Sequence, residues 1–147
     1  RRLTAAADAF DMDQLHPGIM MPCYIDMAQG WAALGEGEKA LACLEKYTDL
    51  AAGDIYPLRL HGDAYFDLLD EWFDSALDLG DYPPRDEAII RRSMTQALTE
   101  NPAFVSLAAE PRFQNMVERL KQNEGHSREK GRGHARENIQ EYAQEGK

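Results

Sequence analysis

The sequence has few of the features that would place it outside the cell or in a membrane. It contains two cysteines, Cys23 and Cys43, in 147 residues. One disulfide cannot hold together a chain of this size and no C-x-x-C pair suggests zinc, so we expect a reducing compartment, the cytoplasm. No apolar run approaches the roughly 20 residues that span a bilayer. The first residues lack Met and a long apolar core, which indicates the interior of a longer protein and not a signal peptide.

Basic residues are also scarce. Lys and Arg number 16 against 26 Asp and Glu, which gives a formal charge of −10. Residues 122–147 hold five of each sign, so the whole excess lies in residues 1–121. A nucleic-acid surface needs clustered Lys and Arg to displace counterions from phosphates. We therefore expect no direct binding of nucleic acid by this chain.

Strand patterns are nearly absent, whereas apolar residues recur at spacings of three and four, which predicts an all-α protein. The expected helices cover residues 2–10, 19 or 22 to 34, 38–51, 64–77, 85–99 and 111–121. We divide the chain into three parts. They are the end of a preceding helix and a loop (1–18), a helical domain (19–121), and a polar tail that is flexible or weakly helical (122–147).

The second and third expected helices carry a recognisable spacing pattern. It consists of Tyr24, Met27, Ala28, Trp31, Gly35, Ala40, Leu44 and Tyr47. The pattern resembles the tetratricopeptide repeat (TPR), in which small residues let the two helices of a hairpin approach and large ones fill the space between them. Gly35 is placed to end the first helix in the left-handed conformation. We expect Trp31, Leu44 and Tyr47 to be buried between the two helices.

The segment from Asn101 to Gln114 has the sequence NPAFVSLAAEPRFQ and looks like the closing element of many bacterial repeat domains. Together with the residues before it, it resembles the C-terminal TPR-like domain of bacterial helix-turn-helix regulators of the xenobiotic-response type. This resemblance implies antiparallel helix hairpins stacked as a short right-handed superhelix, with a DNA-binding domain upstream. It also implies an inner groove lined by Ile25, Gln29, Ala32 and Ala33.

The expected helix 64–77, capped by Asp63, is sharply amphipathic. One side carries the carboxylates of Asp63, Asp67, Asp70, Glu71 and Asp74, and the other carries apolar residues that include Phe66, Leu69, Trp72 and Phe73. Two interpretations stay open for the acidic side. It is either a solvated face or an interaction face that attracts a basic peptide or domain.

No group of residues indicates an enzyme, a cofactor or a metal. The run from Gly35 to Ala40 matches G-x-G-x-x-A, but it follows a helix where a dinucleotide site needs a strand. The four histidines have no second ligand at helical spacing. We expect a non-catalytic protein- or peptide-binding domain of a transcriptional regulator. The alternative is a structural domain that pairs with a second copy and spaces upstream DNA-binding domains.

Overall fold

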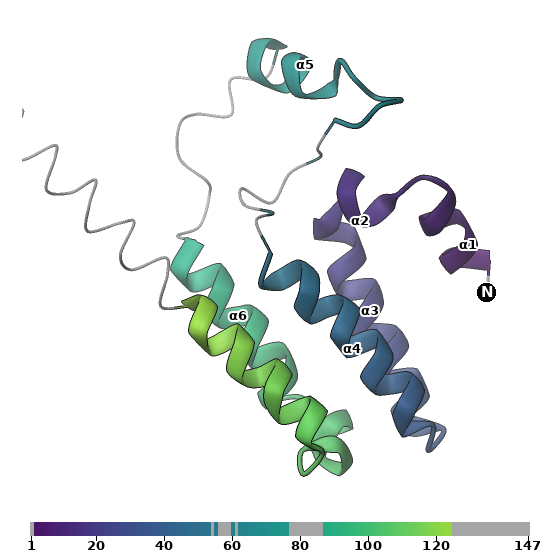
Figure 1. Cartoon of the computed structure of the whole chain (residues 1–147), viewed down its shortest axis with the longest axis vertical. Helices are drawn as coiled ribbons and strands as arrows, with labels where there is room; N and C mark the ends of the chain where they lie inside the picture. Colours follow the sequence, from purple (N-terminus) through teal and green to yellow (C-terminus); the bar gives the residue numbers. More distant parts are fainter. Residues whose placement is uncertain (1, 54, 56–59, 61, 77–86, 125–147) are drawn as a thin grey trace, which may run out of the picture.

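The computed structural model describes residues 2–53, 55, 60, 62–76 and 87–124, and within these ranges every regular element is a helix. The all-α prediction is therefore confirmed for this part of the chain. In order, the elements are α1 (Arg2–Ala9), α2 (Met12–Leu15), α3 (Pro17–Ala33), α4 (Gly37–Ala51), α5 (Leu69–Ala76), α6 (Glu87–Thr99), the 3-10 helix η1 (Pro102–Leu107) and a last helix over residues 111–124 (Figure 1). Nothing in these ranges has both the length and the apolar character of a bilayer-crossing helix.

α3 and α4 form an antiparallel hairpin whose turn is fixed by Gly35. This residue has a φ of 72°, in the left-handed region that glycine adopts without a steric penalty. Its amide donates to the carbonyl of Ala32, and the next amide, that of Glu36, donates to the carbonyl of Trp31. The two bonds make a Schellman motif, which satisfies carbonyls that a helix end leaves without partners. The chain reverses here, and α4 begins at Gly37.

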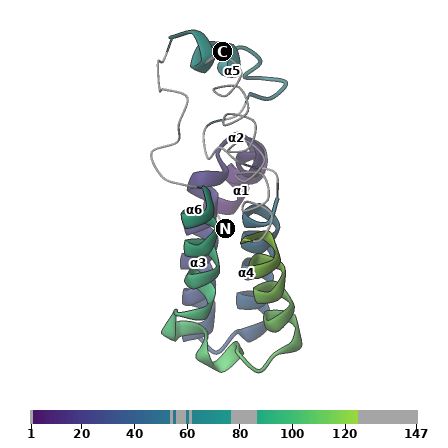
Figure 2. The same ribbon diagram turned by 90° about the vertical axis from the view of Figure 1, so that its left-hand side faces the viewer.

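A second hairpin consists of α6 and the 111–124 helix, and η1 lies in the connection between them. Asn101 caps η1 because its Oδ1 accepts a hydrogen bond from the amide of Ala103 at 3.1 Å. Pro102 follows at the first helical position, where a residue without an amide hydrogen leaves no donor unsatisfied. Figure 2 shows this hairpin packed side by side with the α3–α4 hairpin.

The two hairpins are joined by contacts that run in register along α4. Arg112 contacts Glu45, Arg119 contacts Asp49, and further along the Asn123 side chain donates to the carbonyl of Ala51 at 3.0 Å. Residue numbers increase in the same direction along both helices at these contacts, so the 111–124 helix runs parallel to α4. The hydroxyl of Tyr47 also donates to the carbonyl of Met94 on α6 at 2.9 Å. Both helices of the second hairpin therefore contact α4.

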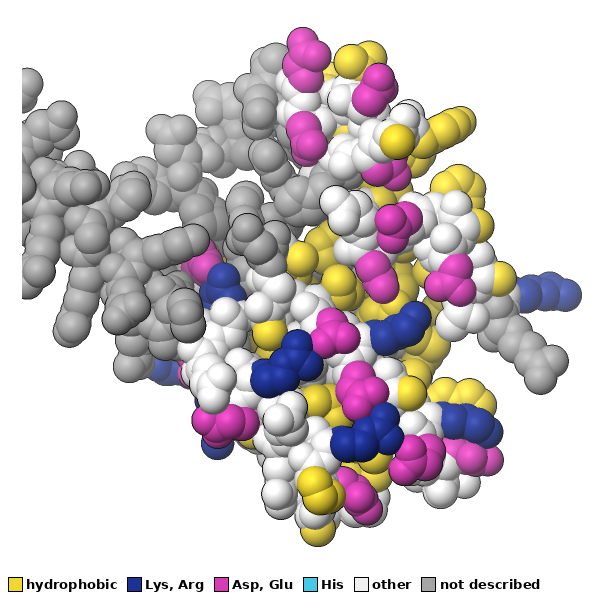
Figure 3. All heavy atoms as spheres, in the orientation of Figure 1, with side chains coloured by type: hydrophobic (Ala, Val, Ile, Leu, Met, Phe, Trp, Pro, Cys, Tyr) yellow, Lys and Arg dark blue, Asp and Glu magenta, His cyan; other side chains and the backbone are white. Residues whose placement is uncertain are grey.

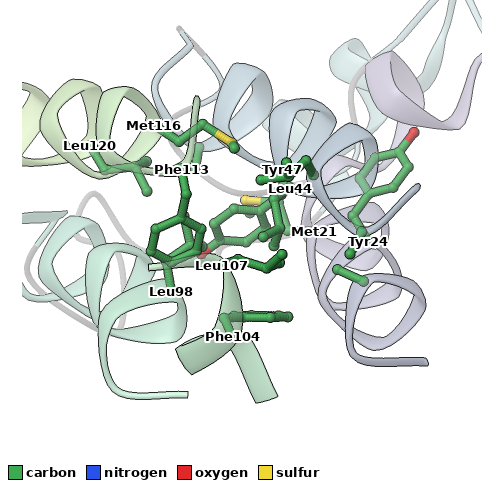
Figure 4. Packing of buried hydrophobic residues seen from close by; sticks show 14 of the residues in the cluster. Met21, Tyr24, Leu44, Tyr47, Leu98, Phe104, Leu107, Phe113, Met116 and Leu120 are labelled. Carbon is green, nitrogen blue, oxygen red and sulfur yellow. The ribbon is translucent and has the colours of Figure 1, made fainter. Parts of the chain in front are cut away.

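The core lies where these four helices and η1 meet. Figure 4 shows side chains of α6, η1 and the 111–124 helix converging on Leu44 and Tyr47 of α4. Ala28 on α3 and Ala40 on α4 are both fully buried, which places a small side chain on each helix of the hairpin. The buried cluster contains Ala7, Met20, Met21, Tyr24, Ala28, Ala40, Leu41, Leu44, Tyr47, Ala51, Leu98, Phe104, Leu107, Phe113, Met116 and Leu120.

The structure corrects the prediction that Trp31 is buried with Leu44 and Tyr47. Leu44 and Tyr47 are at most 2% exposed, but Trp31 is only half-buried, at the edge of the cluster. The reason is its position along the helix. The buried residues of α3 are Pro17, Met20, Met21, Tyr24 and Ala28, whereas Trp31 lies in the last turn, next to the exposed Ala33 and Leu34.

The structure also corrects the helix expected from residue 64, because α5 begins at Leu69. The Oδ1 of Asp63 accepts hydrogen bonds from the amides of Tyr65 and Phe66, at 2.8 and 2.6 Å, as the predicted cap would. Residues 64–68 nevertheless form bends and turns before the helix starts.

Other boundaries differ by smaller amounts. The polar stretch after α1, expected to be a loop, contains the short helix α2, preceded by Asp11 at a φ of 44°. The last helix continues to residue 124 and not 121, so the first three residues of the predicted polar tail are helical. Residues 125–147, and the ends of the two expected helices that fall within 77–86, lie outside the described residues.

The ion pair between Arg112 and Glu45 predicts a pH dependence of stability. Arg112 donates to both Glu45 oxygens at 2.9 Å, and these bonds lower the pKa of Glu45. A carboxyl whose pKa is lowered by folding stabilises the protein above its ordinary pKa of about 4.3, and that contribution disappears as the pH falls through the lowered value. We therefore expect Arg112→Gln to reduce the free energy of unfolding at about pH 7, with the difference from wild type shrinking as the pH falls to about 3. Urea unfolding at both pH values measures it, and a difference independent of pH would contradict it.

Candidate functional site

An apolar groove is lined by residues of α3 and α4, and we call it the α3–α4 groove. Its volume is about 540 Å³. Thr4, near the start of α1, also contributes to the lining. The lining residues are Thr4, Tyr24, Met27, Gly30, Trp31, Leu34, Ala42, Cys43 and Lys46.

The groove exists because α3 is apolar on more than one face. Among its seventeen residues, Pro17–Ala33, Asp26 is the only charged one. One face of α3 packs into the core, and a second stripe, at Tyr24, Met27 and Trp31, repeats at spacings of three and four along the groove. A helix that is apolar nearly all round is normally buried. In this structure Tyr24 is buried, Met27 and Trp31 are only half-buried along the groove, and Leu34 at its end is 72% exposed.

Two lysines flank the aromatic residues of the groove. Lys39 Nζ lies 4.6 Å from the ring centroid of Trp31, and Lys46 Nζ lies 5.5 Å from that of Tyr24. Both distances are within the range of a cation–π interaction. Lys39 also pairs with Glu36 at 3.1 Å. The groove therefore has an apolar floor, and Lys46 is the lysine among its lining residues.

Tyr24 and Cys43 are held in their uncharged forms. The hydroxyl of Tyr24 donates to the two carboxylate oxygens of Asp13 at 2.8 and 2.9 Å. Burial, followed by this bond, raises the pKa of Tyr24 well above its ordinary value. Burial also raises the pKa of the Cys43 thiol, against a smaller opposing effect of Lys46. A thiol whose pKa is raised is a poor nucleophile at neutral pH, so this surface offers shape and apolar contact in place of reactivity.

The four residues that the family resemblance placed in a groove lie on a different stripe of α3. Ile25 and Ala32 are half-buried against the core, Gln29 is half-buried, and Ala33 is exposed. Ile25, Gln29 and Ala32 share one helix face because they are four and seven residues apart. None of the four lines the α3–α4 groove. The sequence feature that could have revealed this groove is the near absence of charged residues in α3. The repeat pattern attributed the apolar residues of this helix entirely to packing in the core.

The predicted acidic face does not form one helical stripe. Asp63 and Asp67 precede α5, while Asp70 and Glu71 lie in its first turn and Asp74 lies further along it. Asp70 Oδ2 accepts a hydrogen bond from the amide of Gly62 at 3.1 Å, so this carboxylate has a structural partner. Figure 3 shows acidic and apolar side chains next to one another over this part of the molecule.

The apolar side of the α5 region is open to solvent in the described structure. The exposed fractions are 82% for Tyr65, 67% for Leu68 and 51% for Trp72. Tyr65 and Phe66 also border a second cavity of about 560 Å³ whose other wall is formed by residues 8–11 at the end of α1. Exposed apolar side chains grouped in this way mark surfaces that bind other molecules.

Within the described ranges, no group of three His, Cys, Asp or Glu side chains is arranged to hold a metal ion. The comparisons with known proteins add no family to this description. No protein-family model matches the chain, and no curated protein or solved structure matches it either. The function has to be argued from the groove and its surroundings.

Proposed function

We propose that this chain is a non-catalytic helical module that binds a protein or peptide segment in the α3–α4 groove. The observation that carries the proposal is the second apolar stripe of α3, which ends at the 72% exposed Leu34. Met27 and Trp31 contribute large, adaptable side chains of the kind found at peptide-binding surfaces. The proposal places the binding stripe on Met27, Trp31 and Leu34, and not on the stripe of Ile25, Gln29 and Ala32.

The chemistry of the groove defines the segment that fits it. An amphipathic helix inserts apolar side chains at spacings of three, four and seven into a groove of this type. Lys39 and Lys46 at the edge favour acidic residues beside those apolar ones. The expected ligand is therefore a short acidic amphipathic helix. From the family resemblance, we propose that this module is the C-terminal part of a transcriptional regulator. Binding of such a segment would then be the signal to which the regulator responds.

A peptide-display selection against the immobilised chain tests this function. We expect enriched peptides to carry two or three apolar residues at helical spacing next to Asp or Glu. Leu34→Asp places a charge at the groove and should weaken the binding of the selected peptides at least about tenfold, which corresponds to 1.4 kcal/mol. Ile89→Asp is the matched control, since Ile89 is also an exposed branched residue, at 60%, but lies on α6.

Equal loss of binding in the two variants would show that added negative charge acts non-specifically. Enrichment of no peptide family, or full binding by Leu34→Asp, would contradict the proposal. Lys46→Glu gives a second measurement: it should reduce the affinity for the acidic peptides and reverse the direction of their salt dependence, while peptides without acidic residues should be affected less.

The structural alternative, in which the chain pairs with a second copy to space upstream domains, is favoured by one specific observation. Leu68 and Trp72 leave an apolar surface open at α5, which a dimer contact would cover. The two functions predict different results for the groove variant, because a dimer formed through α5 surfaces alone is unaffected by Leu34→Asp.

A further inference from the structure

We infer that residues 135–144 of this chain occupy its own α3–α4 groove as a short helix, so that an external ligand has to displace them. This inference rests on the proposed function, because it names a competitor within the chain for the same groove. Three observations support it: the apolar pattern of the segment, the place where the 111–124 helix ends, and the charges of the groove and the segment.

The segment has the pattern and the length that the groove requires. Its apolar residues are separated by four, three and one positions, so a helix over this stretch has one apolar face. Ten residues of helix are about 15 Å long, and the groove follows α3 over a similar length, from Tyr24 to Leu34. The residues of the apolar face are Ala135, Ile139, Tyr142 and Ala143.

No other stretch of sequence outside the described ranges offers such a face. Residues 77–86 contain Gly80, Pro83 and Pro84, which do not continue a helix. Residues 125–134 contain no apolar side chain. The remaining gaps in the description are four residues long or shorter. Residues 135–144 are therefore the one segment beyond the described structure that fits the groove by its sequence.

The 111–124 helix ends near the groove. The Asn123 side chain donates to the carbonyl of Ala51 at 3.0 Å, which places this end of the helix beside the end of α4. Lys46, which lines the groove, is five residues from Ala51, or about 7.5 Å along α4. Lys46 is also three residues from Asp49, which pairs with the 111–124 helix, so the two sites lie on adjacent faces of α4.

The connection between the helix end and the segment has enough length and a suitable charge. Residues 125–134 can span about 33 Å when extended, which exceeds the distance around one helix of about 10–12 Å diameter. They carry three basic residues and one acidic residue, whereas residues 1–121 carry the whole net charge of −10. The connection is therefore attracted to the acidic helical domain.

The segment and the groove also have opposite charges. Residues 137–145 contain Glu137, Glu141 and Glu145 and no Lys or Arg. Lys46 lies 5.5 Å from the Tyr24 ring centroid and has no ion-pair partner among the described residues. An acidic helix in the groove supplies carboxylates near this ammonium group.

Tethering makes a weak contact sufficient. Ile139 and Tyr142 are the two large apolar side chains of the segment, which is enough for a dissociation constant on the order of 0.1 mM. A segment joined to its own site acts at an effective concentration on the order of 1 mM. The groove is then filled about ten times as often as it is empty, which reduces the affinity for an external peptide about tenfold.

Ile139→Asp in the full chain tests the inference. The new charge on the apolar face should release the groove and raise the affinity for the selected peptides about tenfold. Gln144→Asp is the matched control: it adds the same charge about 140° away around the helix and should bind as wild type does. Neither residue belongs to the buried cluster, so both variants keep the core intact. Equal affinities of wild type and Ile139→Asp, or the same gain in both variants, would overturn the inference.

The methyl resonance of Met27 reports on the groove without any added peptide. In protein labelled with carbon-13 at the methionine methyl groups, Ile139→Asp should shift this resonance, because Met27 lines the groove. Gln144→Asp should leave it unchanged, and the effect should be the same in dilute and concentrated samples. An unchanged resonance would overturn the inference. So would a shift seen only at high concentration, since the segment would then bind a second copy.

The two measurements separate this inference from the proposed function. If selected peptides bind through Leu34 and neither measurement responds to Ile139→Asp, the proposed function stands and the inference fails. If no peptide binds but the Met27 resonance responds to Ile139→Asp, the inference stands, and the proposed binding of other proteins fails.

Discussion

Replacing Phe104 with alanine is expected to lower the free energy of unfolding by about 3–5 kcal/mol, the range measured for buried phenylalanines. Phe104 is 1% exposed and belongs to η1, in the connection between α6 and the 111–124 helix. Its ring lies 6.4 Å from that of Phe113 at an interplanar angle of 56°. Deleting the ring leaves a cavity between the two hairpins that α-helical neighbours cannot easily fill, because their backbones are fixed by their own hydrogen bonds.

The control for this change is the next residue. Val105 is 73% exposed on the same turn of η1, so Val105→Ala should alter the free energy of unfolding by less than about 0.5 kcal/mol. Urea denaturation of both variants, followed by circular dichroism, gives the comparison directly. Similar losses in the two variants would mean that η1 contributes through its backbone conformation and not through burial of Phe104. Similar small effects would show that the second hairpin is not packed on the first.

Features fixed by short stretches of chain were predictable from the sequence. The hairpin between α3 and α4 follows from Gly35, since a glycine in the left-handed conformation ends a helix whatever the distant surroundings are. α3 and α4 begin and end within a few residues of their expected positions.

Features that depend on competition or on distant contacts were not predictable. The helix expected from residue 64 has good periodicity and its predicted cap, yet residues 64–68 form bends and turns, and periodicity does not reveal which arrangement wins. The parallel course of the 111–124 helix along α4 depends on contacts between residues about 70 positions apart, such as Arg112 with Glu45. No local pattern encodes that pairing.

The candidate site was missed for a related reason. A repeat pattern treats every large apolar residue of α3 as core, so Trp31 was assigned to the interior with Leu44. The structure shows that α3 has more apolar surface than the core can cover, and the surplus forms the α3–α4 groove. The useful signal was quantitative: a seventeen-residue helix with one charge needs cover on more than one side.

The difference between Leu44 and Trp31 gives the second large prediction. Leu44 is 0% exposed at the centre of α4, so Leu44→Ala should cost about 3 kcal/mol in the free energy of unfolding, within the usual range of 2–5 kcal/mol. Trp31→Ala removes a larger side chain, yet Trp31 is half-buried, so we expect a smaller loss of about 2 kcal/mol. Peptide binding should rank the two in the opposite order: Trp31→Ala removes a wall of the groove and should abolish the binding of the selected peptides, while Leu44→Ala, measured where it is still folded, should retain it. Urea unfolding measures the two stabilities, and titration with a selected peptide measures the two affinities. If Trp31→Ala destabilises the protein more than Leu44→Ala and leaves peptide binding unchanged, then Trp31 serves the core, and the α3–α4 groove is not a binding site.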